Sequence, residues 1–349
     1  MWGINVAATR SHLAVPSFFD RAFLLDRSSS ELADTGPEPQ PTFGCNWVAV
    51  HPNGRALAVT HDDGCIRVRN AADGSLLRLL GPDTDSLYMG AAFHPQFPLI
   101  ATIDFYGELL LYNVDDGRVV WRSDMGFGPG ISVDFSPCGR FLAAGGYGWS
   151  GRMLILAPDG LPVEVRELDS PNKGVLKCVS FAGSNRLLVA SGDGTLVVHE
   201  RFSGRWSAVR SVRGLPKMEL ANGVAASPDG RIAYVVARDQ SLRAFSVESG
   251  EELACGLAHV RGVKSVHASP CGRYVATGSY DRTVMLWDSS NLTVRLPPVR
   301  LANSGVSSVR FGPEGVVFSC SFDGVTMAIE QETGRIRWMR TASDVSEGA

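Results

Sequence analysis

The chain has 349 residues, of which 44% are hydrophobic and 20% are charged, and its formal net charge is -3. This composition is typical of a globular protein with a large apolar interior. The slightly negative charge and the scattered Lys and Arg residues argue against a nucleic-acid partner. The start, MWGINVAATR, is unlike a secretory signal, and no segment approaches the roughly 18 apolar residues of a membrane span. We therefore expect a cytoplasmic protein with no membrane partner.

The seven cysteines are dispersed along the chain and form no close pair with the spacing of a metal or redox site. Such a set fits a reducing compartment, in which free cysteines act as small buried hydrophobic residues. His51 and His94 precede Pro in turns, and His61 and His199 lack a ligand partner in the sequence. We expect no metal site and no cofactor.

A repeat of about 43 residues runs through the whole chain. Equivalent apolar residues recur at intervals of 42 to 46 residues. They are Leu25, Val68, Leu111, Ile155, Val198, Ala244, Leu286 and Ala328. A period of this length indicates a repeat architecture in one domain spanning residues 1–349.

The first copy is degenerate but recognisable in GINVAATRSHLAV followed by FFDRAFLLDRSS, and residues 30–44, with three Pro, are expected to form a loop. Later copies contain an alternating strand, a turn such as HPNGR, SPCGR or SPDGR, a buried strand, an acidic turn, and two further strands. The last residues, TASDVSEGA, are expected to form a tail.

The sequence pattern of each repeat thus predicts four antiparallel strands, and the middle strands are apolar on both faces. One such unit cannot bury both faces alone, whereas units packed radially around an axis can. The predicted fold is an all-β propeller of eight blades, with seven blades as the alternative. The expected blades span approximately residues 3–44, 45–86, 87–129, 130–173, 174–221, 222–261, 262–304 and 305–341.

The seventh copy, SPCGRYVATGSYDRTVMLWD, resembles the repeat of the WD-repeat (WD40-like) family. The resemblance implies a structural hydrogen-bond network within this blade, formed by His259, Thr277, Asp281 and Trp287. Other copies lack the Trp, and the equivalent position holds Arg69, Tyr112, Leu156, His199, Phe245 and Ile329. We therefore expect most blades to be held by apolar packing and the strand ladder alone.

Two copies contain Gly and Trp separated by three residues, in GRVVW ending at Trp121 and GRIRW ending at Trp338. This pattern is similar to the tryptophan-docking motif of eight-bladed quinoproteins. The simpler interpretation, which we favour, is an aromatic residue of the outer strand that packs between blades.

The residue before the acidic turn is aromatic in five of the eight copies, although this turn should lie at one rim of the propeller. With an inserted Trp and one Arg, the candidate partner-binding residues are Phe19, Phe105, Tyr147, Trp149, Arg238, Tyr280 and Phe322. Aromatic residues and Arg are enriched in protein interfaces. The alternative is that these rings lie flat over the neighbouring blade and close its core.

The sequence contains no phosphate-binding loop followed by a helix, and we expect no catalytic residue. The predicted function is a non-enzymatic scaffold of the WD-repeat type that binds a protein or peptide, for example within a larger complex. The alternative is a propeller enzyme or small-molecule-binding protein with a site in the central channel, because such a site is spatial and leaves no local motif.

Overall fold

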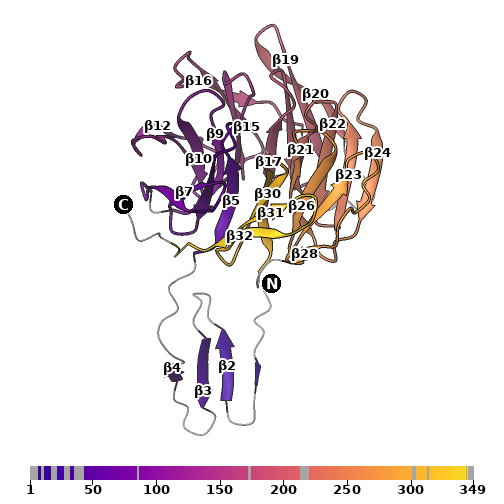
Figure 1. Cartoon of the computed structure of the whole chain (residues 1–349). Helices are drawn as coiled ribbons and strands as arrows, with labels where there is room; N and C mark the ends of the chain where they lie inside the picture. Colours follow the sequence, from indigo (N-terminus) through magenta and orange to yellow (C-terminus); the bar gives the residue numbers. More distant parts are fainter. Residues whose placement is uncertain are drawn as a thin grey trace.

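Figure 1 shows the computed structural model of the chain. The structure describes four N-terminal strands by their backbone, and residues 43–344 apart from 85, 172–173, 213–219, 301–303, 313 and 343. All the regular elements of these residues are β-strands. Each sheet contains four strands that are consecutive in the chain and pair antiparallel.

Seven of the sheets are blades of one ring, and we name the strands of a blade a, b, c and d from the centre outward. The first four blades consist of β5 (Cys45–Val50), β6 (Ala56–His61), β7 (Ile66–Asn70) and β8 (Leu76–Leu80); β9 (Tyr88–Phe93), β10 (Leu99–Asp104), β11 (Glu108–Asn113) and β12 (Val119–Asp124); β13 (Gly130–Phe135), β14 (Phe141–Gly146), β15 (Gly151–Leu156) and β16 (Pro162–Leu168); and β17 (Leu176–Phe181), β18 (Arg186–Ser191), β19 (Leu196–Phe202) and β20 (Arg205–Val212).

The remaining three blades complete the ring. They consist of β21 (Ala221–Ala226), β22 (Ile232–Ala237), β23 (Ser241–Ser246) and β24 (Glu252–Leu257); β25 (Val263–Ala268), β26 (Tyr274–Ser279), β27 (Thr283–Asp288) and β28 (Val299–Arg300); and β29 (Val306–Phe311), β30 (Val316–Ser321), β31 (Thr326–Glu330) and β32 (Ile336–Arg340).

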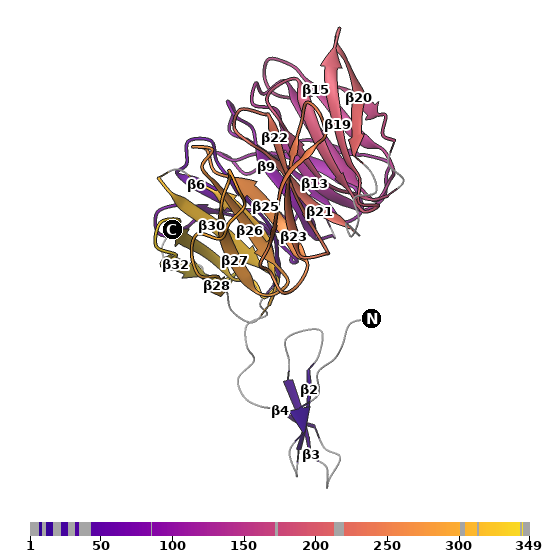
Figure 2. The same cartoon turned by 90° about the vertical axis from the view of Figure 1, so that its right-hand side faces the viewer.

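The inner strands show how the ring closes. Each a strand packs beside the a strand of the next blade, from β5 through β9, β13, β17, β21 and β25 to β29, and β29 packs beside β5. The predicted β-propeller is thus confirmed, with the alternative count of seven blades. Figures 1 and 2 show the ring from two perpendicular directions.

The expected eighth blade, formed by the first copy, is not part of this ring. Its strands β1 (Ala7–Ala8), β2 (His12–Pro16), β3 (Ala22–Asp26) and β4 (Leu32–Asp34) form a separate four-stranded sheet. This sheet lies to one side of the ring in both views (Figures 1 and 2). The reason is that the direct contact of β29 with β5 leaves no place between them. In addition, β1 has only two residues, whereas each inner strand of the ring has six.

The apolar core lies between adjacent blades. At the closing junction, for example, Val48 and Val59 of blade β5–β8 cluster with Phe318 and Trp338 of blade β29–β32. The strand-c position that holds Trp287 in the best repeat is buried in every ring blade, whichever residue type occupies it. The strand-c position equivalent to Trp287 is therefore a core position in every blade of the ring.

The turns between strands lie on two opposite faces of the ring. Because each blade is a meander, the turns between strands a and b emerge on one face, the ab face, and those between b and c on the other, the bc face. The ab turns are stabilised locally: Ser269 Oγ accepts a hydrogen bond of 2.9 Å from the Tyr274 N–H, and Gly272 adopts a φ of 74°. The bc turns carry the predicted aromatic residues.

Candidate functional site

The described candidate residues all lie in bc turns, on one face of the ring. Phe105, Tyr147, Trp149 and Phe322 are 40%, 48%, 69% and 36% exposed, and Arg238 is exposed as well. Tyr280 is half-buried. Phe19 lies outside the described residues. Large apolar side chains at such exposure are a feature of interaction surfaces.

Tyr280 and Phe322 come from adjacent blades and stack on each other. Their rings are 5.9 Å apart between centroids, at an interplanar angle of 10°. Gly305 lies beneath this pair, and a Cβ there would come within 3.3 Å of the Tyr280 ring and 3.5 Å of the Phe322 ring. One side of each ring therefore contacts the protein, as the packing alternative expects, and part of each ring remains exposed.

Tyr147 lies on another part of the same face, beside a cation. The Lys177 ammonium lies 5.5 Å from the centroid of the Tyr147 ring, within the range of a cation–π contact. Trp149, in the two-residue insertion of the same turn, has no ring contact among the described residues and is the most exposed of the candidate aromatic side chains.

Three further apolar side chains extend this surface, and the sequence analysis did not select them. Phe43 is 36% exposed, Tyr106 68% and Val260 76%. Phe43 was assigned to a loop, and Tyr106 follows the position that was compared between copies. Among the described residues, every exposed aromatic side chain except Phe202 lies on the bc face. This asymmetry between the two faces was not visible in any single repeat.

The inner edge of the bc face carries unpaired positive charge. Lys177, Lys264 and Arg238 have no carboxylate within 4 Å among the described residues. Burial, followed by the charge of Lys177, lowers the pKa of Lys264 to about 8. Burial and the charge of Arg238 lower the pKa of Lys177 as well. Lys177 thus repels Lys264 and is itself repelled by Arg238, and none of the three cations has a counter-ion in the part of the chain that the structure describes.

The acidic residues of the bc turns do not neutralise these cations, because they are engaged within their own turns. Asp63, Asp193, Asp239 and Asp281 each accept a hydrogen bond of 3.0 to 3.1 Å from the backbone N–H two residues further on. Asp63 and Asp239 also pair with Arg residues of the same blade. The bc face therefore presents apolar rings and cations.

The structure brings together the four residues of the expected network in blade β25–β28. His259 contacts Asp281 through Nδ1 and Thr277 Oγ1 through Nε2, each at 2.7 Å, and the Trp287 indole N–H donates to Thr277 Oγ1 at 2.8 Å. Burial alone would raise the pKa of Asp281, but hydrogen bonds from His259 and Thr283 hold it well below its usual range. His259, Thr277 and Trp287 are buried, so these contacts are enclosed within the blade.

Comparison with known families agrees with this geometry. The family model described as "WD domain, G-beta repeat" matches residues 250–288, which contain the whole network. The chain is thus a β-propeller that contains a WD repeat. A second model, described as "Outer membrane protein assembly factor BamB", matches residues 106–253 of this WD-repeat chain.

Several curated proteins are similar to this WD-repeat propeller. "Periodic tryptophan protein 2" of Saccharomyces cerevisiae is 23% identical over 272 residues, covering 64% of this chain and 28% of that protein. "Eukaryotic translation initiation factor 3 subunit I" of Pyricularia oryzae is 32% identical over 89 residues, covering 26% of each chain. The human "Angio-associated migratory cell protein" is 24% identical over 310 residues, covering 83% of this chain and 68% of that one. The chain spans only about a quarter of the length of the first two.

Other kinds of site were also sought in this WD-repeat chain. The residues that the structure describes contain no group of three His, Cys, Asp or Glu side chains placed to hold a metal ion. Within the same residues, no helix has the length and apolar character needed to cross a membrane. All seven cysteines are free, and Cys45, Cys65, Cys178 and Cys320 are buried.

The two GxxxW tryptophans behave as the packing interpretation predicted. Trp338 is 7% exposed, packs against Phe318 of its own blade and donates a hydrogen bond of 3.1 Å to the Ala71 carbonyl of the adjacent blade. Trp121 packs against the core between its blade and the next. Both residues therefore contribute to packing between blades.

Proposed function

We propose that the protein is a non-enzymatic scaffold whose bc face binds an acidic segment of a partner protein. The observation that carries this proposal is the concentration on one face of exposed aromatic rings and of cations that have no counter-ion among the described residues. Aromatic rings supply most of the contact area in protein interfaces, and Glu or Asp of the partner would neutralise Lys177, Lys264 and Arg238.

The rigidity of the ring favours this use. The turns of the bc face are fixed by hydrogen bonds to their own Asp residues, and the strands that carry them are paired throughout the blade. A partner therefore does not have to order the surface when it binds, which reduces the entropic cost of association. The similarity to proteins such as a translation initiation factor subunit supports a protein partner, since a subunit by its name works in a complex.

A cytoplasmic location is part of the same proposal. All seven cysteines are free thiols, as expected in a reducing compartment. The alternative of a propeller enzyme receives no support from the described residues, in which the His–Thr–Asp set of blade β25–β28 is enclosed in a structural network.

The test compares proteins captured from the native organism by the wild-type chain and by two variants. The double variant Tyr280→Ala/Phe322→Ala removes the ring stack, and Phe202→Ala, on the opposite face, is the matched control with 66% exposure. We expect the double variant to lose at least about tenfold in affinity for the captured partner, as for an interface hot spot, and the control to retain it.

A charge reversal tests the acidic character of the partner. Lys177→Glu should weaken capture further, and moderate salt should weaken the wild-type complex, because screening reduces the attraction between surface charges. Arg78→Glu, on an outer strand, is the control. Unchanged capture by the double variant, with its thermal unfolding intact, would refute the proposed face.

A further inference from the structure

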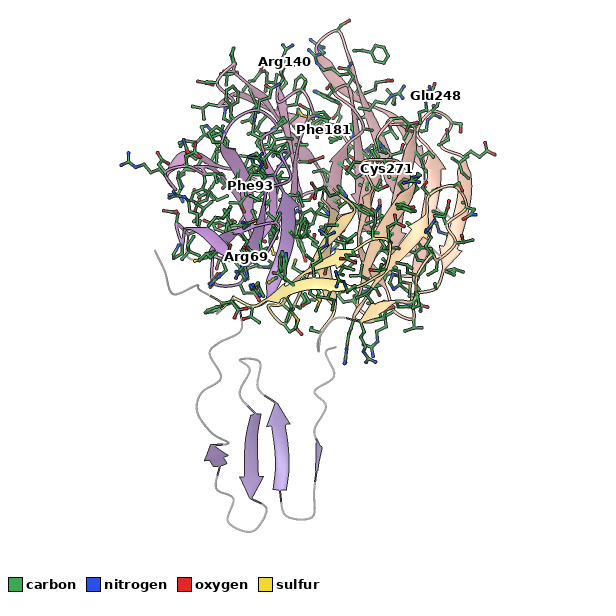
Figure 3. All side chains as sticks on the ribbon, in the orientation of Figure 1. Arg69, Phe93, Arg140, Phe181, Glu248 and Cys271 are labelled. Atoms are coloured by element: carbon green, nitrogen blue, oxygen red, sulfur yellow. The ribbon has the colours of Figure 1, made fainter. Side chains whose placement is uncertain are left out.

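The opposite mouth of the central channel forms a second candidate site, independent of the bc face. A cavity of about 550 Å³ opens on the ab face, between the ends of the seven inner strands. Phe93 and Phe181, which are labelled in Figure 3, belong to two of these strand ends and border the cavity. A volume of this size is typical of small-molecule sites, which usually measure about 300–1,000 Å³.

The penultimate residue of each inner strand lines this cavity, so seven equivalent positions form one ring of side chains. Three of them are alanines, which leave the centre open, and four are polar. The alanines are Ala49, Ala92 and Ala225, and the polar residues are Asp134, Ser180, His267 and Arg310. The polar residues occupy two pairs of adjacent blades, and alanine-bearing blades separate the pairs on both sides.

One pair, on β25 and β29, presents hydrogen-bond donors. Arg310 lies over the Trp47 ring, 4.5 Å from its centroid, and donates to the carbonyl of Val309 at 2.7 Å. No carboxylate lies within 4 Å of its guanidinium among the residues that the structure describes. The Trp47 ring thus holds the cation in a fixed position without neutralising it.

His267 adds a second donor beside Arg310. Its Nδ1 accepts a hydrogen bond of 3.1 Å from the Phe311 backbone N–H, which can only donate. Burial and the charge of Arg310 lower the pKa of His267 to about 3, so the ring is neutral at physiological pH. The remaining proton is therefore on Nε2, which is a donor. A planar carboxylate could accept from both side chains.

The other pair, on β13 and β17, presents hydrogen-bond acceptors. Asp134 accepts a hydrogen bond of 2.8 Å from the Phe181 N–H, and no cationic side chain lies within 4 Å of it in the described part of the chain. Burial raises the pKa of Asp134 to about 6, against the opposing effect of Arg310, so the carboxyl is ionised at neutral pH but at a cost. The Ser180 side chain occupies the same level of the adjacent strand.

The cavity therefore contains one positive and one negative group, which face it from separate sides without pairing. Two separated, partly desolvated charges are unfavourable, and a ligand that contacts both would relieve the penalty of each. We propose that the ab mouth of the channel binds a small zwitterion, with its carboxylate at Arg310 and His267 and its ammonium group at Asp134 and Ser180. The α-amino acids are the simplest members of this class, and they fit within the cavity.

The test measures binding to the full chain by isothermal titration calorimetry and thermal shift, with the twenty common L-amino acids, acetate and methylammonium as probes. At least one amino acid should bind and raise the melting temperature, with a Kd at least tenfold lower than those of acetate and methylammonium. Arg310→Met and Asp134→Asn should each weaken its binding at least tenfold. Arg335→Met, an exposed Arg of the outer rim, and Phe322→Ala should leave it unchanged.

A further variant guards against a loss of folding in the charge variants. Ala92→Leu fills the cavity without altering its charges, and we expect it to abolish amino-acid binding while the chain remains folded. Three outcomes would overturn the proposal: no amino acid binds, acetate binds as tightly as every amino acid, or binding survives in both Arg310→Met and Ala92→Leu. The second outcome would indicate a simple anion site.

Discussion

Two blades use the same strand-c position in different ways. In blade β25–β28 the position holds Trp287, whose indole N–H bonds Thr277 within the blade. In blade β5–β8 it holds Arg69, which is 1% exposed and donates to the carbonyls of Gly74 at 3.0 Å and of Thr341 at 2.7 Å. Trp287 therefore stabilises its own blade, whereas Arg69 connects its blade to the end of the chain.

This difference follows from the way in which the ring closes. Every blade is built from consecutive strands, so no sheet combines strands from both ends of the ring. The first and last blades must instead be joined by side chains. Arg67 donates to the Ala342 carbonyl at 3.1 Å, and Arg340 donates to the Asp73 carbonyl at 2.8 Å. Arg69 is the most deeply buried member of this set and lies close to the last blade (Figure 3).

The largest expected effect is that of Arg69→Ala. The substitution leaves the Gly74 and Thr341 carbonyls without this donor and opens a cavity at the junction, so we expect a loss of about 3–5 kcal/mol in the free energy of unfolding. Denaturant unfolding measures the change, and Arg78→Ala, an exposed Arg of the same blade, is the control. Arg69→Met keeps the aliphatic stem. If that variant is as stable as the wild type, the carbonyl contacts contribute nothing to closure.

The sequence predicted the repeat and the blade-internal network, because both are local: period, turn residues and the His, Thr, Asp and Trp spacing lie within single copies. It did not predict the role of Arg69. The expectation that most blades rely on apolar packing and the strand ladder alone is wrong, because three of the polar residues that replace the Trp form hydrogen bonds. Tyr112 contacts Tyr88 at 2.6 Å and Asp83 at 2.8 Å, and His199 contacts the Asp169 carbonyl at 2.6 Å.

The partners of these substitutes explain the failure. The bonds of Arg69 to the chain terminus join residues 272 positions apart, a separation that no repeat pattern encodes. The eight-blade expectation failed for a similar reason, because the number of blades depends on whether β29 meets β5. The channel ring was also not visible, since Asp134, His267 and Arg310 come from three different copies and meet only when the ring forms.

A smaller effect is expected from Thr277→Val in the network of the other blade. Thr277 Oγ1 is the shared partner of His259 and Trp287, and the nearly isosteric substitution leaves both buried side chains without a hydrogen bond. We expect a loss of about 2–3 kcal/mol in unfolding free energy, less than for Arg69→Ala because no cavity forms. Thr293→Val, which removes an exposed hydroxyl, is the matched control. Equal costs at Thr277 and Thr293 would contradict a structural role of the network.

Lowering the pH should further distinguish the contributions of the two blades to stability. The folded state holds the pKa of Asp281 below that of the unfolded chain, so its stabilisation is present above about pH 4 and is lost as pH falls through the folded value. Arg69 bonds carbonyl groups, which do not titrate. The difference in unfolding free energy between wild type and Asp281→Asn, about 1–2 kcal/mol at pH 7, should therefore shrink on acidification. The loss of unfolding free energy caused by Arg69→Ala should stay constant over the same pH range. If the losses caused by Asp281→Asn and Arg69→Ala declined in parallel, the proposed difference between the two blades would be wrong.

The smallest expected effect is at the outer edge of the closing junction. Trp338 donates its indole N–H to the Ala71 carbonyl across the junction, and its ring lies over Gly74, where a Cβ would come within 2.7 Å of it. Trp338→Phe keeps most of the apolar contact and loses the hydrogen bond, at a cost of about 1 kcal/mol. Trp121→Phe, at the equivalent position of another blade, is the control.

Because both Trp338 and Arg69 act on this junction, the double variant Trp338→Phe/Arg69→Ala should lose less unfolding free energy than the sum of the two single variants. The losses of Trp338→Phe and Thr277→Val should instead be additive. Strict additivity in both pairs would show that the junction does not act as one unit.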